Sequence, residues 1–148
     1  MSTVRDLLRA KPPEVWTVEP QASVYEALQL MADKDIGAVL VLDGGMLVGL
    51  FSERDYARKV VLYGRTSRET TVGELMTQVL FYVTPRQTVE ECLALMTEKH
   101  VRHLPVMEST SLAGLISIGD VGKAIMSEQE TTIRHLETYI TGSAATRT

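Results

Sequence analysis

The sequence predicts an α+β (α/β) fold made of two copies of a β-α-β-β-α unit, followed by a C-terminal helix. An internal repeat and the order of helix and strand patterns within it predict this fold. When the sequence is aligned with itself at an offset of 65 residues, residues 18–56 match residues 83–121 without a gap, and 14 of the 39 pairs are identical. Only about two or three identities are expected by chance at average residue usage. The chain therefore contains one unit twice.

We divide the 148 residues into repeat 1 (residues 1–66), repeat 2 (67–126), and a C-terminal helix with a flexible tail (127–148). A shorter segment also recurs, because Val4-Arg-Asp-Leu-Leu matches Val72-Gly-Glu-Leu-Met at an offset of 68. A unit of about 65 residues has only a marginal core of its own. We therefore expect the two copies to pack about a pseudo-twofold axis into a single compact body.

The first copy begins with a short strand expected at residues 15–18, which ends before Pro20. Ser23 is a suitable N-cap for the helix that follows. The apolar residues of this helix recur at the i, i+3, i+4, i+7 spacing of one helical face. They are Val24, Ala27, Leu28 and Met31.

A β-hairpin is expected next, because the aliphatic runs 38–42 and 46–51 flank the turn Asp43-Gly-Gly. Ser52 then begins a second helix, which is expected to end near Gly64, since glycine is common just after a helix.

The second copy repeats this order. A helix with its apolar face at equivalent positions precedes strands at residues 104–107 and 112–116, and another helix starts at Ser117. The apolar face of the first of these helices contains Val89, Cys92, Leu93 and Met96. Ser127-Glu-Gln-Glu130 has the pattern of a capping box, which predicts that a separate terminal helix begins there. Its apolar residues are Ile133, Leu136 and Ile140.

One motif occurs where the hairpin of each copy meets the following helix. It reads Gly49-Leu-Phe-Ser-Glu-Arg-Asp55 in the first copy and Gly114-Leu-Ile-Ser-Ile-Gly-Asp120 in the second. One interpretation is helix capping, in which Ser and Asp bond to the first-turn amides. The other is a nucleotide site, because a helix N-terminus with a hydroxyl attracts phosphate and a carboxylate can accept both ribose hydroxyls. Its occurrence twice in register favours the nucleotide.

With Val101-Arg-His-Leu-Pro-Val106 before the second hairpin, the doubled unit resembles the cystathionine β-synthase (CBS) domain, a tandem pair of which is a Bateman module. The resemblance covers about residues 1–126, and the paired motif in register makes it specific. Residues 51–56 and 117–121 resemble the small stand-alone bacterial members. It implies a non-catalytic, regulatory module in signal transduction. Such modules bind adenosine-containing ligands (AMP, ADP, ATP, S-adenosylmethionine or NAD(H)) in clefts between the repeats, and they usually form homodimers.

The resemblance also implies which residues bind the nucleotide. Asp55 and Asp120 match the acid that holds the ribose, and Ser52 and Ser117 match the hydroxyl near the phosphate. The remaining positions approach the base or the phosphate. They are Thr17, Ile36, Gly37 and Ala38 in the first copy, and Thr84, Val101, Arg102 and His103 in the second. Arg54, Pro105 and Gly119 are further candidate contacts.

The two sites are not expected to be equal. Arg102 offers a charge-assisted donor and Gly119 leaves room at the helix start, so we expect the Asp120 site to take the more phosphate-rich part of a ligand. Arg54, Arg58 and Lys59 are expected to reach a second phosphate at the Asp55 site.

Composition excludes several other classes of function. With 15 basic and 19 acidic residues, the net charge of −4 argues against nucleic acid as a partner. The apolar run at residues 36–42 is far shorter than the roughly 20 residues that span a membrane. Charged residues precede it, so we expect no signal peptide, no membrane association and a cytoplasmic location.

No catalytic or metal-binding pattern stands out. Cys92 is expected to be a small buried residue, Trp16 a core or dimer contact, and the three histidines lack metal-ligand spacing. Without a nucleophile beside a base or a phosphate loop, we expect no enzyme, no catalytic cofactor and no metal.

The protein effector is unknown. The alternative to a nucleotide sensor is a dimeric scaffold that has no physiological nucleotide and acts through its C-terminal helix.

Overall fold

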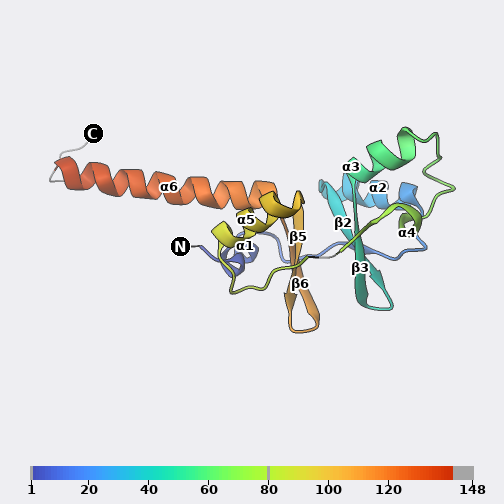
Figure 1. The fold of residues 1–148 in the computed structure, drawn as a ribbon, viewed down its shortest axis with the longest axis horizontal. Coiled ribbons are helices and arrows are strands. Elements are labelled where there is room, and N and C mark those ends of the chain that lie inside the picture. The colour runs from blue at the N-terminus through green and yellow to red at the C-terminus, as the bar shows by residue number, and fades with distance from the viewer. Residues whose placement is uncertain (1, 80, 142–148) are drawn as a thin grey trace. The chain divides into compact units, whose positions relative to one another are not determined.

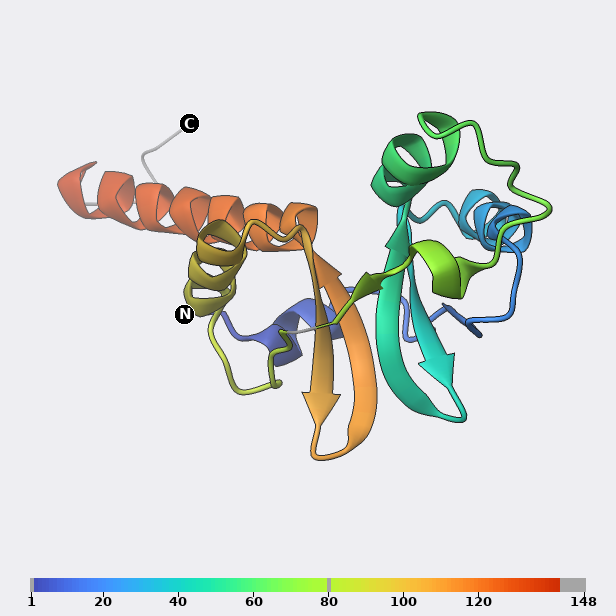
Figure 2. The same ribbon diagram turned by 45° about the vertical axis from the view of Figure 1, so that its right-hand side comes forward.

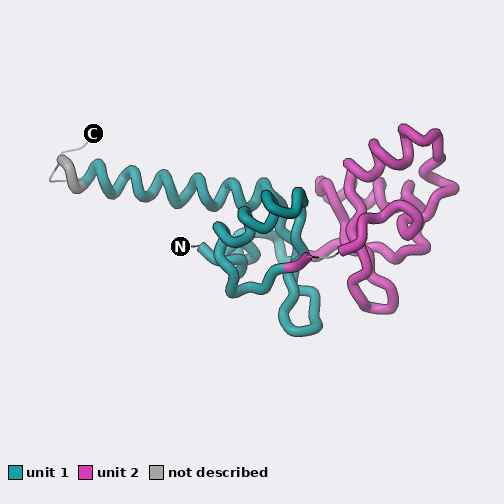
Figure 3. The backbone as a smooth tube through the Cα atoms, viewed as in Figure 1, with its two compact units in different colours: residues 1–13, 83–148 teal, residues 14–82 magenta. Residues whose placement is uncertain are grey.

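The structure is a computed structural model that describes residues 2–79 and 81–141. It divides into two compact units (Figure 3). Unit 1 comprises residues 1–13 and 83–148, and unit 2 comprises residues 14–82. Each unit contains one of the two predicted hairpins, so both the repeat and its α+β order are confirmed (Figure 1).

Unit 2 is built on a four-stranded sheet with the strand order β1-β2-β3-β4. β1 is parallel to β2, and the other neighbouring pairs are antiparallel. Its strands are β1 (Thr17–Val18), β2 (Ala38–Asp43), β3 (Met46–Ser52) and β4 (Thr77–Gln78). Its helices are α2 (Val24–Lys34), α3 (Glu53–Asp55), a π-helical segment (Tyr56–Val61) and α4 (Val72–Leu75).

Unit 1 is built on a two-stranded antiparallel hairpin of β5 (His103–Glu108) and β6 (Ser111–Ser117). A single parallel bridge between Val83 and Val106 stands where unit 2 has β1. The helices are α1 (Val4–Arg9), α5 (Val89–Lys99) and α6 (Ile118–Thr141). Figures 1 and 2 show α5 beside the first turns of α6, whose later turns extend away from the rest of unit 1.

Equivalent apolar residues form the cores of the two units. The Ser23 hydroxyl accepts the Glu26 N–H at 3.0 Å, which begins α2 at the predicted cap. The predicted apolar face of α2 is confirmed by its three buried residues, which pack against β2, β3, α4 and the π-helical segment. On α5, Leu93 was also predicted on the apolar face, but it is 36% exposed. The buried residues are Val24, Ala27 and Met31 on α2, and Val89, Cys92 and Met96 on α5.

The short helices α1 and α4 explain the sequence echo at an offset of 68. The Val4 and Val89 N–H groups donate to Gln87 O and Ser2 O, at 2.8 and 3.0 Å, and tie α1 to the segment that leads into α5. Equivalent bonds, both 2.8 Å, tie α4 to the segment that leads into α2. Each short helix therefore packs with the copy from which it is more distant in the sequence: α1 with the second and α4 with the first. The boundaries of the two compact units therefore differ from those of the two sequence repeats.

A prediction about the C-terminal helix is wrong. Residues 118–141 form one continuous helix, so the Ser127-Glu-Gln-Glu130 pattern is not a helix start. The Ser127 carbonyl accepts the Thr131 hydroxyl at 3.0 Å inside the helix. No proline interrupts residues 118–127, and α6, capped at Ser117, therefore continues through this segment. The predicted flexible tail after Thr141 lies outside the described residues.

The helix after Ser52 begins where predicted but changes character. After α3 it continues as the π-helical segment, and Gly64 follows with a φ of 68°, the left-handed geometry expected at a helix end. The edge strand β4 was not predicted.

Candidate functional site

The motif at the β3–α3 junction of unit 2 forms a complete capping box. The Ser52 hydroxyl accepts the Asp55 N–H at 3.2 Å. Asp55 Oδ2 accepts the Ser52 N–H and the Ser52 hydroxyl, both at 3.0 Å. The capping interpretation is therefore confirmed for the first copy.

The β6–α6 junction of unit 1 shows the same reciprocal bonds. The Ser117 hydroxyl accepts the Asp120 N–H at 3.1 Å, and Asp120 Oδ2 accepts the Ser117 N–H at 2.8 Å. Capping does not exclude a ligand role, because a carboxylate has about four acceptor positions on its two oxygens.

The segment before each hairpin contacts the same junction. The Glu53 N–H donates to Gly37 O at 3.0 Å, and the Ile118 N–H donates to Arg102 O at 2.9 Å. At both helix starts, the first and third amides are therefore already bonded within the protein. An anion cannot use these two amides unless the cap opens.

The hairpins bring the other predicted residues toward these junctions. In unit 2, Ala38 pairs with Ser52, and Thr17 on β1 lies opposite Leu40. Ile36, two residues before β2, is half-buried, and Arg54 is exposed on α3.

In unit 1, His103 pairs with Ser117, and Val83 pairs with Val106 further along β5. The Val83 N–H donates to Pro105 O at 3.0 Å, which places the adjacent Thr84 beside β5. The half-buried Val101 precedes β5. A Cβ on Gly119 would meet only the Ser117 hydroxyl, at 3.5 Å, so this position is open.

The two acidic residues differ in their surroundings. Asp55 is only 8% exposed. Its Oδ1 accepts the Thr77 hydroxyl at 3.0 Å and contacts Lys59 Nζ at 3.2 Å. With the two donors from Ser52, Asp55 thus has four, as many as a carboxylate normally accepts. Lys59, which is expected to reach a phosphate, contacts Asp55 and donates to Leu75 O at 3.0 Å.

Asp120 has fewer partners. Lys11 Nζ approaches its Oδ2 at 2.7 Å and also donates to Leu115 O at 2.8 Å. Its other oxygen, Oδ1, accepts no hydrogen bond from the part of the chain that the structure describes. Burial alone would raise the pKa of Asp120, but the bonds from Lys11 and Ser117 and the charge of Lys11 outweigh it and hold the pKa below its ordinary value of 3.8. The carboxylate is therefore ionised at neutral pH.

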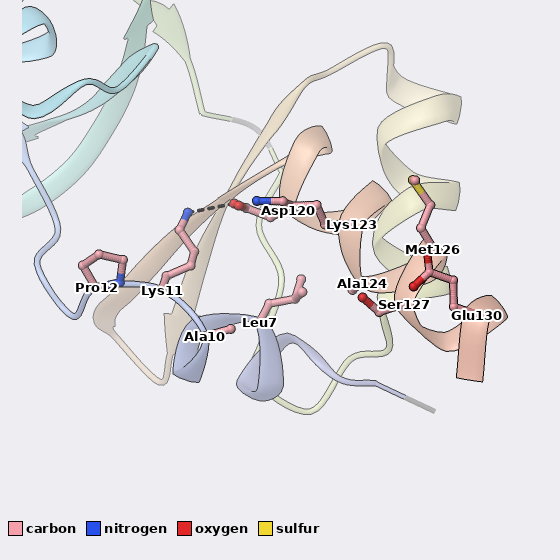
Figure 4. Close-up of a pocket in the computed structure, with 10 residues that line it drawn as sticks. All are labelled: Leu7, Ala10, Lys11, Pro12, Asp120, Lys123, Ala124, Met126, Ser127 and Glu130. Atoms are coloured by element: carbon pink, nitrogen blue, oxygen red, sulfur yellow. Dashed lines mark hydrogen bonds and ion pairs between the residues drawn. The ribbon is translucent and has the colours of Figure 1, made fainter. Parts of the chain in front are cut away.

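A cavity of about 600 Å³ opens beside Asp120 within unit 1 (Figure 4). Lys11 points toward the carboxylate, and Lys123 lies on α6 one turn beyond it. The wall combines these charges with apolar surface from α1 and α6. The lining residues are Leu7, Ala10, Lys11, Pro12, Asp120, Lys123, Ala124, Met126, Ser127 and Glu130.

Sequence reasoning missed several of these residues. Lys11 is 109 positions from Asp120 and belongs to no local pattern that links the two. Lys123 could have been found, because it follows Asp120 at the i+3 spacing that places two residues on one helical face. Thr77 was missed with the edge strand that carries it.

Two further residues have the structural roles expected of them. Cys92 is completely buried, and burial raises the pKa of its thiol to about 11. Trp16 packs against the core of unit 2, and Lys34 Nζ lies 4.3 Å from its ring centroid.

Within residues 2–79 and 81–141, no His, Cys, Asp or Glu side chains cluster in a way that could hold a metal, and no helix is both long and apolar enough to cross a bilayer.

Comparisons with known proteins identify relatives of the whole repeat pair. The family model of the CBS domain matches residues 4–62 and 72–127. The mitochondrial CBS domain-containing protein CBSX3 of Arabidopsis thaliana is 34% identical over 151 residues, which cover 95% of this chain and 73% of that protein. The CBS domain-containing protein YhcV of Bacillus subtilis is 32% identical over 129 residues, which cover 87% and 89%.

A solved structure shows the same similarity. A protein with CBS domains from Burkholderia ambifaria MC40-6 is 50% identical and superposes with a TM-score of 0.82. The match covers 86% of this chain and 96% of that one.

Proposed function

Because this chain belongs to the CBS-domain family, as a tandem pair of CBS repeats, we propose that it is a regulatory module that binds an adenosine-containing nucleotide. The ligand is AMP, ADP, ATP or NAD(H), and its site includes the β6–α6 junction of unit 1. Binding, and not catalysis, is the activity.

The observation that carries the proposal is the environment of Asp120. This ionised carboxylate has one oxygen without a partner in the described chain, and it borders the cavity of about 600 Å³. The two hydroxyls of a ribose can donate to such a carboxylate. Lys11 and Lys123 supply positive charge for phosphate, and Leu7 and Ala124 add apolar wall.

The other residues implied by the family resemblance are proposed as contacts of the same kind. Those of the second copy are proposed to act with Asp120, and those of the first copy with Asp55. They are Thr84, Val101, Arg102, His103, Pro105, Ser117 and Gly119, and Thr17, Ile36, Gly37, Ala38, Ser52 and Arg54.

The regulatory effect would follow from preferential binding. A ligand that binds one conformation more tightly shifts the population toward it, and an effector protein can detect the shift. A homodimer and a cytoplasmic location remain predictions. The Arabidopsis relative is named as mitochondrial.

One observation favours the scaffold alternative. The later turns of α6 expose Met126 (62%), Ile133 (54%) and Leu136 (56%). These residues recur at spacings of seven and three, as on a helix that packs against another helix. In this alternative, α6 contacts a second protein chain and the cavity has no physiological nucleotide.

A thermal-shift panel separates the two candidates. AMP, ADP, ATP, NAD(H) and S-adenosylmethionine are each added to the full chain and to Asp120→Asn. A ligand at 100 times its Kd stabilises by about 2.7 kcal/mol. For a chain of this size, this corresponds to a shift of several degrees, at roughly 2–4 °C per kcal/mol.

We expect at least one nucleotide to raise the Tm of the wild type, and Asp120→Asn to remove most of the shift. A flat panel for every ligand would contradict nucleotide binding and support the scaffold.

A further inference from the structure

Lys11 is placed to act in ligand binding, although no sequence pattern links it to the site. It lies between α1 and β1, and its ammonium contacts Asp120 Oδ2 on α6 at 2.7 Å and Leu115 O on β6 at 2.8 Å. Figure 4 shows this side chain in the wall of the cavity beside Asp120. Its side chain is 35% exposed and that of Asp120 is 23% exposed.

Lys11 therefore holds one of the two oxygens that a ribose would use. A vicinal diol offers two hydroxyl donors, and a carboxylate accepts both most readily when neither oxygen is bound to an ammonium group. A nucleoside must compete with Lys11 for Oδ2 and gives the displaced ammonium no new partner.

A nucleotide carries its own replacement partner. Its phosphate bears the negative charge that the ammonium loses when it leaves Asp120. The four-carbon stem of lysine rotates freely and its ammonium has no fixed donor geometry, so it can follow a point charge. A partly exposed ion pair contributes little to stability, so its release costs little free energy.

We propose that Lys11 exchanges the Asp120 carboxylate for the phosphate of the bound ligand, and that this exchange selects nucleotides over nucleosides. The inference rests on the proposed function, because it concerns the same site. It adds a specificity-determining residue and predicts that AMP binds more tightly than adenosine.

Removing the ammonium has opposite effects on the two ligands. In Lys11→Met, the ribose no longer competes with an ammonium group for Asp120 Oδ2, so adenosine binds more tightly. AMP loses a charge-assisted partner and binds more weakly. A residue that only adds positive charge to the cavity would weaken AMP and leave adenosine unchanged, which is the behaviour expected of Lys123.

The experiment is calorimetric titration of AMP and of adenosine into the full chain, Lys11→Met, Lys11→Gln and the control Lys123→Met. We expect the ratio of AMP to adenosine affinity to fall roughly tenfold or more in both Lys11 variants, with adenosine binding improved. In Lys123→Met, only AMP should weaken. If circular dichroism shows that Lys11→Met is unfolded, the affinity ratio is taken from Lys11→Gln alone.

Equal changes in the two affinities, or unchanged affinities, would overturn the role of Lys11 while nucleotide binding stands. If neither ligand binds the wild type, the proposed function itself fails, and the inference fails with it.

Discussion

At the scale of single residues, the two copies use one motif for different purposes. Asp55 is buried and has four donors, which come from Ser52, Lys59 and Thr77. Asp120 keeps one oxygen without a described partner and lies beside a cavity. The same Ser-x-x-Asp pattern is therefore mainly a structural cap in the first copy, and a cap with spare acceptor capacity in the second.

This difference predicts unequal costs of the same substitution. Asp55→Asn introduces an amide where a buried carboxylate accepts four donors, so it should lower the free energy of unfolding by about 2 kcal/mol. Asp120→Asn breaks a partly exposed pair and should cost about 1 kcal/mol or less. Urea denaturation of both variants measures the difference. Equal losses would show that Asp55 has no special structural role.

At the scale of elements, each hairpin packs closely against a short helix or the residues just after it: β6 against α1, and β3 against the segment that follows α4. A Cβ on Gly114 would lie 2.6 Å from Cδ2 of Leu8, which belongs to α1. The equivalent Cβ on Gly49 would lie 2.5 Å from Met76 Sδ and 3.0 Å from the Thr77 carbonyl oxygen. Both glycines are therefore required for close packing, and only the contact at Gly49 includes backbone that cannot rotate away.

Substitution by alanine should distinguish packing from helix propensity. Gly49→Ala should destabilise by about 1–3 kcal/mol, because Thr77 cannot move without disturbing β4. Gly122 lies within α6 with nothing within 4 Å of a Cβ, so Gly122→Ala should stabilise by about 0.5–1 kcal/mol. Chemical denaturation of both variants tests this pair. A loss of stability in Gly122→Ala would contradict the open surroundings of that helix position.

At the scale of the whole molecule, the local parts of the fold were predictable. Ser23, Ser52 and Ser117 identify helix starts because capping depends on residues three positions apart. The aliphatic runs around Asp43-Gly-Gly identify a hairpin for a similar reason. Ser127 misled because a capping pattern inside a continuous helix looks the same as one at a helix start.

The candidate site was only partly predictable. Ser117 and Asp120 could be identified from a motif that occurs twice. Lys11 could not, because its contact with Asp120 depends on α1 packing with the second copy, and pairing between residues 109 positions apart leaves no periodic signal. Thr77 was missed because a two-residue edge strand is too short to show alternation.

The central claim is that a nucleotide binds at Asp120, and direct titration tests it best. Isothermal titration of AMP into the wild type, Asp120→Asn and Asp55→Asn, at a temperature where all three are folded, compares two acids in the same motif. We expect Asp120→Asn to lose at least tenfold in AMP affinity at the β6–α6 junction, because the ribose loses a charged acceptor, whereas Asp55→Asn, which lies in the other unit, leaves the affinity at that junction within about twofold of the wild type. Full affinity in Asp120→Asn would contradict it.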